Sequence, residues 1–131
     1  MRGVEIITEF APYIPRIELD GDQMRQVAIN LILNAGGAMP EGGTLKIRTA
    51  MIADQRVTIK FHDSGCGIPA ESLDKIFEPF YTSRNTGTGL GLYIARELLE
   101  SNNAQITYLP NEPSGSNFRI FFSTSASQDT A

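Results

Sequence analysis

The chain of 131 residues contains one cysteine, Cys66, and one histidine, His62. A lone cysteine excludes an intramolecular disulfide, and together with a lone histidine it excludes a Cys/His zinc cluster. No stretch approaches the ~20 apolar residues that a membrane span needs, and no basic segment followed by an apolar one opens the chain. We therefore expect a soluble, cytoplasmic domain without direct membrane contact, which can be one piece of a longer protein.

Positive charge is also scarce, since 11 Lys and Arg stand against 15 Asp and Glu and give a formal net charge of −4. This balance argues against a nucleic-acid partner bound by bulk electrostatic attraction. The length is sufficient for one domain with its own core and too short for two. We expect one folded domain over residues 1–124 and a polar, disordered tail over residues 125–131.

Hydrophobic periodicity predicts strands and helices that follow one another without strict alternation. Strands are expected at Val4–Phe10, Thr44–Ile52, Arg56–His62, Gln105–Leu109 and Phe118–Thr124, with Arg16–Leu19 as a candidate for one more. Helices are expected from an Asp20 cap to about Ala38, over Ala70–Ile76 and over Gly89–Asn102, and hairpin turns at Ala53–Gln55 and Pro110–Ser116. This order favours an α+β fold, a two-layer α/β sandwich, over a doubly wound parallel sheet.

Two asparagines one helical turn apart stand out in the first of these helices. Gln26, Asn30 and Asn34 are spaced by four residues and form one polar stripe on a helix. The rest of Val27–Ala35 is apolar, so we expect this helix to be mostly buried. A buried carboxamide without a partner costs about 1–3 kcal/mol. The stripe therefore needs a metal ion, a ligand or a second polar element, unless the amides form a satisfied ladder in the core.

A glycine-rich run, Gly87–Leu92, leads directly into the third predicted helix. Such a turn points backbone N–H groups and the positive end of the helix dipole outward, which suits a phosphate. The run is not a P-loop, because no Gly-Lys-Ser/Thr follows. It is also a poor dinucleotide fingerprint, because the preceding Tyr81–Thr86 is not a strand. A glycine-rich cap on an ordinary helix is the alternative at this point.

Asp63 ends a predicted strand and enters the loop Gly65–Gly67. A carboxylate there can accept a hydrogen bond from an exocyclic amine, while the glycines allow a flat ring to approach the backbone. An EF-hand is excluded because the loop holds one acid where several are needed. The alternative is a turn capped by an aspartate. We expect Ser64 and Cys66 to be ordinary loop residues and His62 to be structural.

Taken together, the motifs resemble those of the ATP-binding catalytic domain of bacterial sensor histidine kinases, within the ATPase and kinase group shared with gyrase, Hsp90 and MutL. The resemblance extends from about Val4 to Phe122. The matching motifs are the N box Gln26–Ala35, the first glycine box Asp63–Ile68, the F box Ile76–Ser83 and the second glycine box Gly87–Leu92. The resemblance implies a Bergerat-type fold, with a mixed, mostly antiparallel sheet of about five strands packed on about three helices.

The resemblance also implies roles in binding ATP and Mg²⁺. Asn34 would coordinate Mg²⁺, and Asn30 would lie beside the phosphates or the water shell of the metal. These two asparagines are the candidate catalytic residues. Asp63 would bind the adenine amino group. The base pocket would be shaped by Gly65, Gly67 and Ile68.

The phosphates and the lid would involve the next two motifs. The residues that would cradle the phosphates are Gly87, Thr88, Gly89, Leu90, Gly91 and Leu92. A short flexible lid would span Glu78–Thr86, with Thr82, Ser83 and Arg84 as its nucleotide-binding candidates. Phe77 and Phe80 would anchor the lid against the core. Many relatives carry a basic residue at the position of Gly37, so Arg84 is the best substitute for that phosphate contact.

The function implied by the resemblance is transfer of the γ-phosphoryl group of ATP to a histidine on a separate helical dimerisation domain of the same protein. A response-regulator receiver domain would act downstream, and no nucleic-acid partner is expected. The resemblance also implies that the whole kinase can be membrane-anchored, with this domain in the cytoplasm. In ATPases of the group the position of Asn30 is a Glu that activates water, and an amide cannot take up a proton at neutral pH. We therefore expect slow hydrolysis. His62, in a predicted strand, cannot be the phosphorylated histidine. The alternatives are a degenerate nucleotide-binding scaffold, a gyrase-type ATPase and an anti-sigma-type serine kinase.

Overall fold

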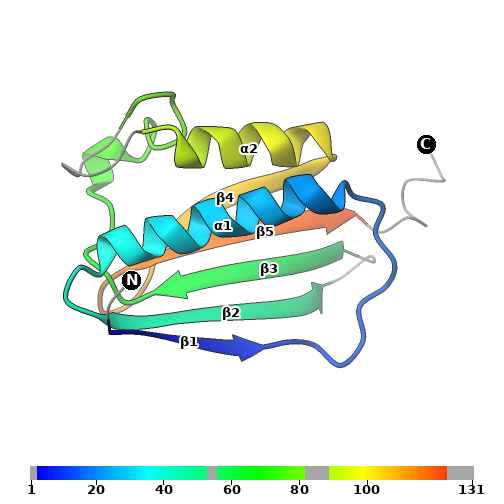
Figure 1. Ribbon diagram of the computed structural model, residues 1–131, viewed down its shortest axis with the longest axis horizontal. Helices are drawn as coiled ribbons and strands as arrows, with labels where there is room; N and C mark the ends of the chain where they lie inside the picture. The colour runs from blue at the N-terminus through cyan, green and yellow to red at the C-terminus, as the bar shows by residue number, and fades with distance from the viewer. Residues whose placement is uncertain (1–2, 53–55, 82–88, 124–131) are drawn as a thin grey trace.

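The computed structural model describes residues 3–52, 56–81 and 89–123 and shows a layer of helices on a five-stranded sheet (Figure 1). The strands are β1 (Val4–Glu9), β2 (Gly43–Ile52), β3 (Arg56–Asp63), β4 (Ala104–Pro110) and β5 (Ser116–Ser123). The helices are α1 (Gly21–Ala38), α2 (Gly91–Ser101) and the short 3₁₀ helix η1 (Ala70–Ser72). The predicted α+β fold with two layers is confirmed.

The sheet is mixed and mostly antiparallel, as expected, with the strand order β1-β2-β3-β5-β4. β1 pairs with β2 in parallel, and the other neighbouring pairs are antiparallel. A parallel pair requires a crossover connection, whereas an antiparallel hairpin needs only a short turn. The connection from β1 to β2 contains α1, which therefore lies across one face of the sheet (Figure 1).

α1 begins where the sequence predicts because Asp20 caps it. The Asp20 side chain accepts a hydrogen bond from the Gln23 N–H at 3.0 Å, which satisfies one of the amides that a helix start leaves unpaired. The Asp20 N–H donates to Asn102 Oδ1 at 2.9 Å, and Asn102 Nδ2 donates to Gln23 Oε1 at 2.8 Å. The first turn of α1 is thereby joined to Asn102, the cap residue that follows α2.

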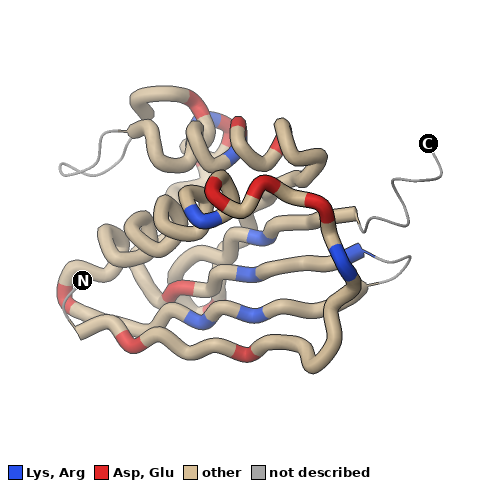
Figure 2. Tube along the Cα trace, turned by 45° about the vertical axis from the view of Figure 1, so that its right-hand side comes forward, with Lys and Arg blue, Asp and Glu red and all other residues tan. Residues whose placement is uncertain are grey.

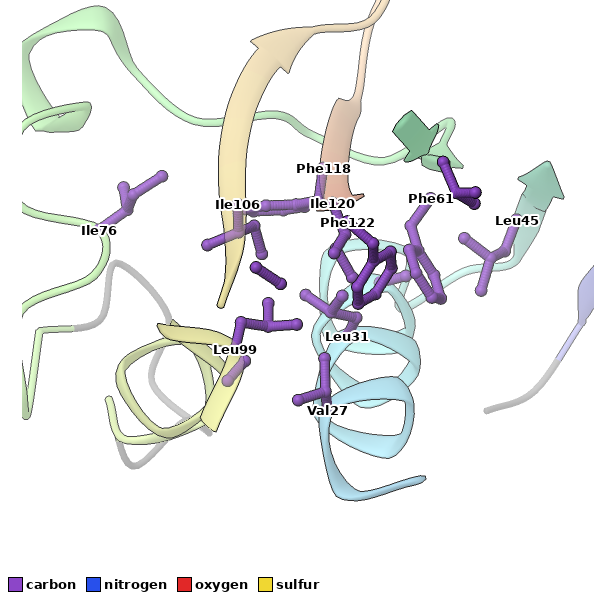
Figure 3. Close-up of a cluster of buried hydrophobic side chains, with 14 of the residues drawn as sticks. Val27, Leu31, Leu45, Phe61, Ile76, Leu99, Ile106, Phe118, Ile120 and Phe122 are labelled. Carbon is purple, nitrogen blue, oxygen red and sulfur yellow. The ribbon is translucent and has the colours of Figure 1, made fainter. Parts of the chain in front are cut away.

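The core lies between the sheet and the two α-helices (Figure 3). α1 contributes Val27, Leu31 and Ala35, which are spaced by four residues along one face, and α2 contributes Ala95 and Leu99. Alternate strand residues point toward the helices and include Phe61, Phe118, Ile120 and Phe122. The strand residues between them lie on the opposite side of the sheet, the open face, which neither α-helix covers (Figure 1).

The segment Arg16–Leu19 is not a strand, contrary to the expectation. Between β1 and α1 the chain has no regular secondary structure. Pro12 and Pro15 lack the N–H group that a sheet ladder requires. Ile17 and Leu19 are partly buried against the core. The apolar alternation therefore reflects packing of a connecting segment and not strand pairing.

Other predictions are wrong in extent. Ala70–Ile76 forms only η1 followed by turns, since a helix this short is marginal on its own. α1 is not mostly buried, because it packs on one side only and leaves Ile29 and Leu33 exposed at 42% and 61%. The predicted turn Ala53–Gln55 and residues 124–131, which include the predicted tail, lie outside the described residues. Within the described ranges, no helix is long and apolar enough to cross a membrane.

Candidate functional site

The motifs predicted from the sequence meet at one end of the sheet (Figure 1). There β3 ends at Asp63, α1 ends at Ala38, α2 begins and the chain turns back from β4 to β5. Hydrogen bonds join these distant segments. The Cys66 N–H donates to the Ala38 carbonyl at 3.2 Å, and the Ser116 N–H donates to the Asp63 carboxylate at 3.1 Å. A ligand bound at this end of the sheet can contact several motifs at once.

Asp63 is buried at this end of the sheet, with 2% of its surface exposed. Its Oδ1 accepts hydrogen bonds from the Gly65 N–H at 2.9 Å and the Ser116 N–H at 3.1 Å. Its backbone carbonyl accepts another from Asn111 Nδ2 at 2.9 Å. A buried carboxylate is costly unless it is hydrogen-bonded, and bonds from N–H groups to an ionised acceptor are strong. The fold therefore holds a fixed acidic acceptor inside the site.

The connection from β4 to β5 is the part of the site that the sequence analysis missed. The sequence predicts only a hairpin turn for the segment that contains Asn111, Gly115 and Ser116. Gly115 has a φ of +109°, and a Cβ at this position would overlap the Asp63 carbonyl oxygen. Gly flanked by serines is a signal for a turn. The contact of Gly115 with Asp63, about 50 positions earlier, has no such local signal in the sequence.

The first glycine box packs tightly against the end of α1. A Cβ at Gly65 would lie 2.5 Å from the Ala38 carbonyl oxygen. Gly67 adopts a φ of +74°, in the left-handed region that favours glycine. The Ile68 N–H donates to the Tyr108 hydroxyl at 3.2 Å, and Ile68 is partly buried on the core. The loop after Asp63 is thus shaped by close backbone contacts that side chains would prevent.

Part of the polar stripe on α1 is an amide ladder. Gln26 Nε2 donates to Asn30 Oδ1 at 2.7 Å, and Asn30 Nδ2 donates to the Gly91 carbonyl at 3.1 Å. Asn30 therefore links the N box to the first residue of α2, with both ends of its amide bonded to the protein. Asn34 lies one helical turn farther along α1, toward the site, and is half-buried. The two asparagines thus have different surroundings.

The second glycine box leads into α2 as predicted, and its described part contacts the F box. Gly89 has a φ of +77° and precedes α2 by two residues. The Phe80 N–H donates to the Gly89 carbonyl at 2.8 Å. A Cβ at Gly89 would lie 2.6 Å from Phe80 Cα. Glycine at this position is therefore required for the two motifs to meet through their backbones.

The two F-box phenylalanines differ, although both were expected to pack on the core. Phe77 makes an edge contact with Phe118, with ring centroids 6.3 Å apart, and the Arg96 guanidinium lies 5.4 Å above the Phe77 ring. Phe80 is 74% exposed. Its backbone has a φ of +67° and reaches Gly89 through the N–H group, so the ring is not an anchor. The prediction for Phe80 is wrong.

Several predicted nucleotide-binding residues lie outside the described residues. They are Thr82, Ser83, Arg84, Gly87 and Thr88. Among the residues that the structure does describe, no group of three or more His, Cys, Asp or Glu side chains could hold a metal ion.

His62 precedes Asp63 in β3, and strand alternation places its side chain on the open face. Burial lowers the pKa of His62, and the positive charges of Lys60, Arg48 and Lys46 lower it further, against a hydrogen bond from His62 to the Asn111 side chain that raises it. His62 is therefore neutral near pH 7. The side chain lies on the other side of the sheet from the Asp63 carboxylate.

The lowered pKa of His62 predicts a component of stability that depends on pH. Above the unfolded-state pKa of 6.5 both states are neutral, but as the pH falls below it the unfolded state binds a proton that the folded state resists. Stability is therefore lost on acidification. His62→Gln should reduce the loss of unfolding free energy between neutral pH and about pH 5. Urea denaturation of both proteins at the two pH values measures this difference, and equal losses would contradict the prediction.

Comparison with known proteins identifies the family. Residues 19–126 match the family described as histidine kinase-, DNA gyrase B-, and HSP90-like ATPase. Sporulation kinase E of Bacillus subtilis is 32% identical over 120 residues, which are 92% of this chain and 16% of that protein. The sensor histidine kinase ZraS of Escherichia coli is 38% identical over 108 residues, which are 82% of this chain and 23% of that protein. The chain thus spans less than a quarter of the length of these relatives.

Solved structures share the fold. The catalytic domain of the histidine kinase ThkA matches with a TM-score of 0.79 and 34% identity, over 92% of this chain and 79% of that chain. The mycobacterial sensor histidine kinase MprB matches with a TM-score of 0.81 over 91% of this chain and 80% of that chain; at 24% identity this supports the fold alone. The chain therefore belongs to the histidine kinase-, DNA gyrase B- and HSP90-like ATPase family, as a catalytic ATP-binding domain of the histidine kinase type.

Proposed function

We propose that the domain binds ATP with Mg²⁺ and supplies the γ-phosphoryl group to a histidine on a separate helical dimerisation domain of the same protein. The buried Asp63 carries this proposal, because Oδ1 is held by two backbone N–H groups. A carboxylate has about four acceptor positions on its two oxygens. The group can therefore also accept a hydrogen bond from the amino group of adenine.

The start of α2 supports the phosphate part of the proposal. N–H groups in the first turn of a helix point outward and lie at the positive end of its dipole. The bond from Asn30 to the Gly91 carbonyl fixes this turn relative to α1. We assign Gly89–Leu92 to the phosphates on this basis. Asn30 would then act by positioning the phosphate-binding turn.

Asn34 is the protein ligand that we propose for Mg²⁺. This ion commonly takes one or two protein oxygens and completes its shell with phosphate oxygens and water. The residues fit this chemistry, since α1 offers an amide oxygen at Asn34 and the described chain holds no cluster of three acidic, thiol or imidazole groups. When bound, Mg²⁺ would neutralise negative charge on the phosphates.

Asn30 supports transfer to a protein side chain over transfer to water. An amide does not accept a proton at neutral pH, and here its two ends bond to Gln26 and Gly91. His62 is no acceptor, because it lies on the open face away from Asp63. The acceptor would therefore come from another domain, and this domain would contribute positioning and charge neutralisation.

A response regulator is the downstream partner that we propose. A structure of the histidine kinase ThkA in complex with the response regulator protein TrrA matches this chain with a TM-score of 0.78 and 30% identity, over 95% of this chain and 35% of that chain. By analogy, a receiver domain would take the phosphoryl group from the phosphorylated histidine. We place these steps in the cytoplasm, where ATP is available.

Asn34→Ala is expected to lower ADP affinity about tenfold in the presence of Mg²⁺ and to change it little in the presence of a chelator, because only the metal-dependent contact is removed. Isothermal titration calorimetry with and without Mg²⁺ measures both values. Gln105→Ala removes an exposed amide on β4 and serves as the control. Equal effects of Asn34→Ala with and without the metal would contradict the assignment of Asn34.

Phosphotransfer is tested by mixing the domain with labelled ATP and the histidine-bearing helical domain of a ZraS-type relative. An acid-labile, base-stable label on the helical domain is expected, as for phosphohistidine. No nucleotide binding up to millimolar concentration would exclude the proposal. Nucleotide binding without transfer would favour the scaffold alternative. Steady ATP turnover by the isolated domain would favour a gyrase-type ATPase. An acid-stable label on serine would favour the serine-kinase alternative.

A further inference from the structure

The open face of the sheet is rich in positive charge although the whole chain is negative. Strand alternation and register place Lys46, Arg48, Arg56, Lys60 and Arg119 on this face, next to core residues that point the other way. They are five of the 11 Lys and Arg of a chain whose net charge is −4. Figure 2 shows Lys and Arg positions along β2, β3 and β5. Positive charge is therefore concentrated on one side of the molecule.

Three of these cations lie side by side across the sheet. Arg48 is in register with Lys60, and Lys60 is in register with Arg119. Like charges directly opposite each other on a sheet are destabilising. The Glu9 carboxylate on the edge strand lies with Oε1 2.9 Å from Arg48 Nε and with Oε2 3.9 Å from Lys46 Nζ. Lys60 and Arg119 form no salt bridge with any described residue, so the repulsion around them is not neutralised by the described chain.

Polar atoms without protein partners gather on the same face. Five buried side-chain nitrogen or oxygen atoms of the described residues have no hydrogen-bond partner. Four belong to open-face residues, and they are Thr58 Oγ1, His62 Nε2, Asn117 Oδ1 and Arg119 Nε. Buried polar groups are normally satisfied. Their concentration here indicates that groups from outside this chain complete the hydrogen bonding.

Two shallow depressions on the open face could receive such groups. One of about 220 Å³ is lined by residues that include Arg48, Thr58 and Lys60. The other, of about 210 Å³, is lined by residues that include Lys46, Arg48 and His62. Arg48 borders both. The face thus offers two adjacent positions in which a side-chain carboxylate would meet a cation.

We propose that the open face is a docking surface for an acidic, extended protein segment, whose carboxylates pair with Arg48, Lys60, Arg119 and Lys46. Same-side residues of an extended chain are spaced by about 7 Å and neighbouring strands by about 4.8 Å. A segment that crosses the strands obliquely can therefore place successive carboxylates over successive cations. Charge complementarity of this kind gives register and partner choice. This proposal is independent of nucleotide binding.

A nucleic acid or a membrane fits the face less well. Binders of single strands stack bases on exposed aromatic rings. Phe121 on this face already has Arg56 and Arg119 at 5.2 and 5.4 Å from its ring centroid. Phe10 lines one of the depressions and is a single exposed ring, whereas a strand of bases stacks on several. A long polyanion would extend beyond this face to the rest of a chain whose net charge is −4, whereas a short acidic segment covers the cations alone. A flat anionic lipid surface would also cover Glu5 and Glu9 on the edge strand, whereas a narrow segment over β3 and β5 would not.

The test measures binding of a labelled peptide of alternating Glu and Ser by fluorescence anisotropy at low salt. The double variant Lys60→Gln/Arg119→Gln should bind at least about tenfold more weakly. The control Arg25→Gln/Lys75→Gln, which removes two exposed charges elsewhere, should bind within about twofold of the parent chain. The single variant Lys60→Gln should also melt at a higher temperature than the parent, since repulsion across the strands is relieved.

Two results would overturn the proposal. One is that the parent chain does not bind the peptide, and the other is that the control variant weakens binding as much as the open-face variant does. If the chain binds an oligothymidylate or phosphatidylserine vesicles more tightly than the peptide, the proposed partner is wrong, and a nucleic acid or a membrane takes its place. Cooperative thermal unfolding shows that the variants are folded, so the peptide test gives a result whether or not the domain binds ADP.

Discussion

Asp63→Asn is expected to lower ADP affinity by roughly ten- to a hundredfold while the domain stays folded. An asparagine oxygen can still accept the N–H groups of Gly65 and Ser116 that now bond to Oδ1. The second oxygen, however, becomes an NH₂ group, which donates where adenine also donates. The lost bond to an ionised acceptor is worth about 1.5–3 kcal/mol. Calorimetric titration with ADP, with and without Mg²⁺, measures the change.

Asp63→Ala separates recognition from structure. It leaves two buried N–H groups without an acceptor, at about 1–3 kcal/mol each, so we expect a loss of unfolding free energy of about 2–6 kcal/mol in urea. Asp63→Asn should lose much less. If Asp63→Asn binds ADP like the parent chain, Asp63 does not contact adenine, and the carboxylate serves only to hold the connection from β4 to β5.

Gly65→Ala is the second change for which a large effect is expected. The added Cβ would lie 2.5 Å from the Ala38 carbonyl oxygen and 2.7 Å from Ala38 Cβ. Neither atom is the end of a flexible side chain, so α1 and the first glycine box must separate. Overpacking of this kind costs about 1–3 kcal/mol, and the hydrogen bond from Cys66 to Ala38 would be strained with it. Urea denaturation should show the loss, and ADP affinity should fall because Asp63 shifts.

Gly21→Ala is the matched control. It makes the same chemical change in the first turn of α1, where an added Cβ meets no atom within 4 Å. Alanine is a better helix former than glycine by about 1 kcal/mol, so this variant should be as stable as the parent chain or more so. Equal stability of Gly65→Ala and Gly21→Ala would show that the end of α1 is compliant.

The regular elements could be predicted because their signals are local. Asp20 caps α1 through a residue three positions away, and in β5 every second residue is buried, as the predicted strand requires. Arg16–Leu19 shows the limit of this approach. Alternating apolar residues were interpreted as a strand, but Pro12 and Pro15 and the absence of a neighbouring partner among the described strands left a packed connecting segment.

The candidate site was predictable to the extent that its motifs are short. Asp63 and its glycines are contiguous, so their loop could be interpreted directly from the sequence. The bonds that hold Asp63 come from Asn111 and Ser116, which are 48 and 53 residues away. Phe80 was misassigned for a related reason, since its left-handed backbone, and not its side-chain type, decides that the ring is exposed. Long-range contacts and backbone angles of this kind produce no periodic pattern in the amino-acid sequence.

The hydrogen bonds between the two α-helices have a mechanical consequence. They join α1 to α2 beside the site, through Asn30, and at the opposite end of the molecule, through Asn102. Because α1 and α2 are hydrogen-bonded to each other at both ends, we expect the two helices to move together as one rigid unit. α1 has 18 residues and is therefore about 27 Å long. Because the bonds lie at both ends of this length, a displacement of α2 would also move the first turn of α1 at Asp20.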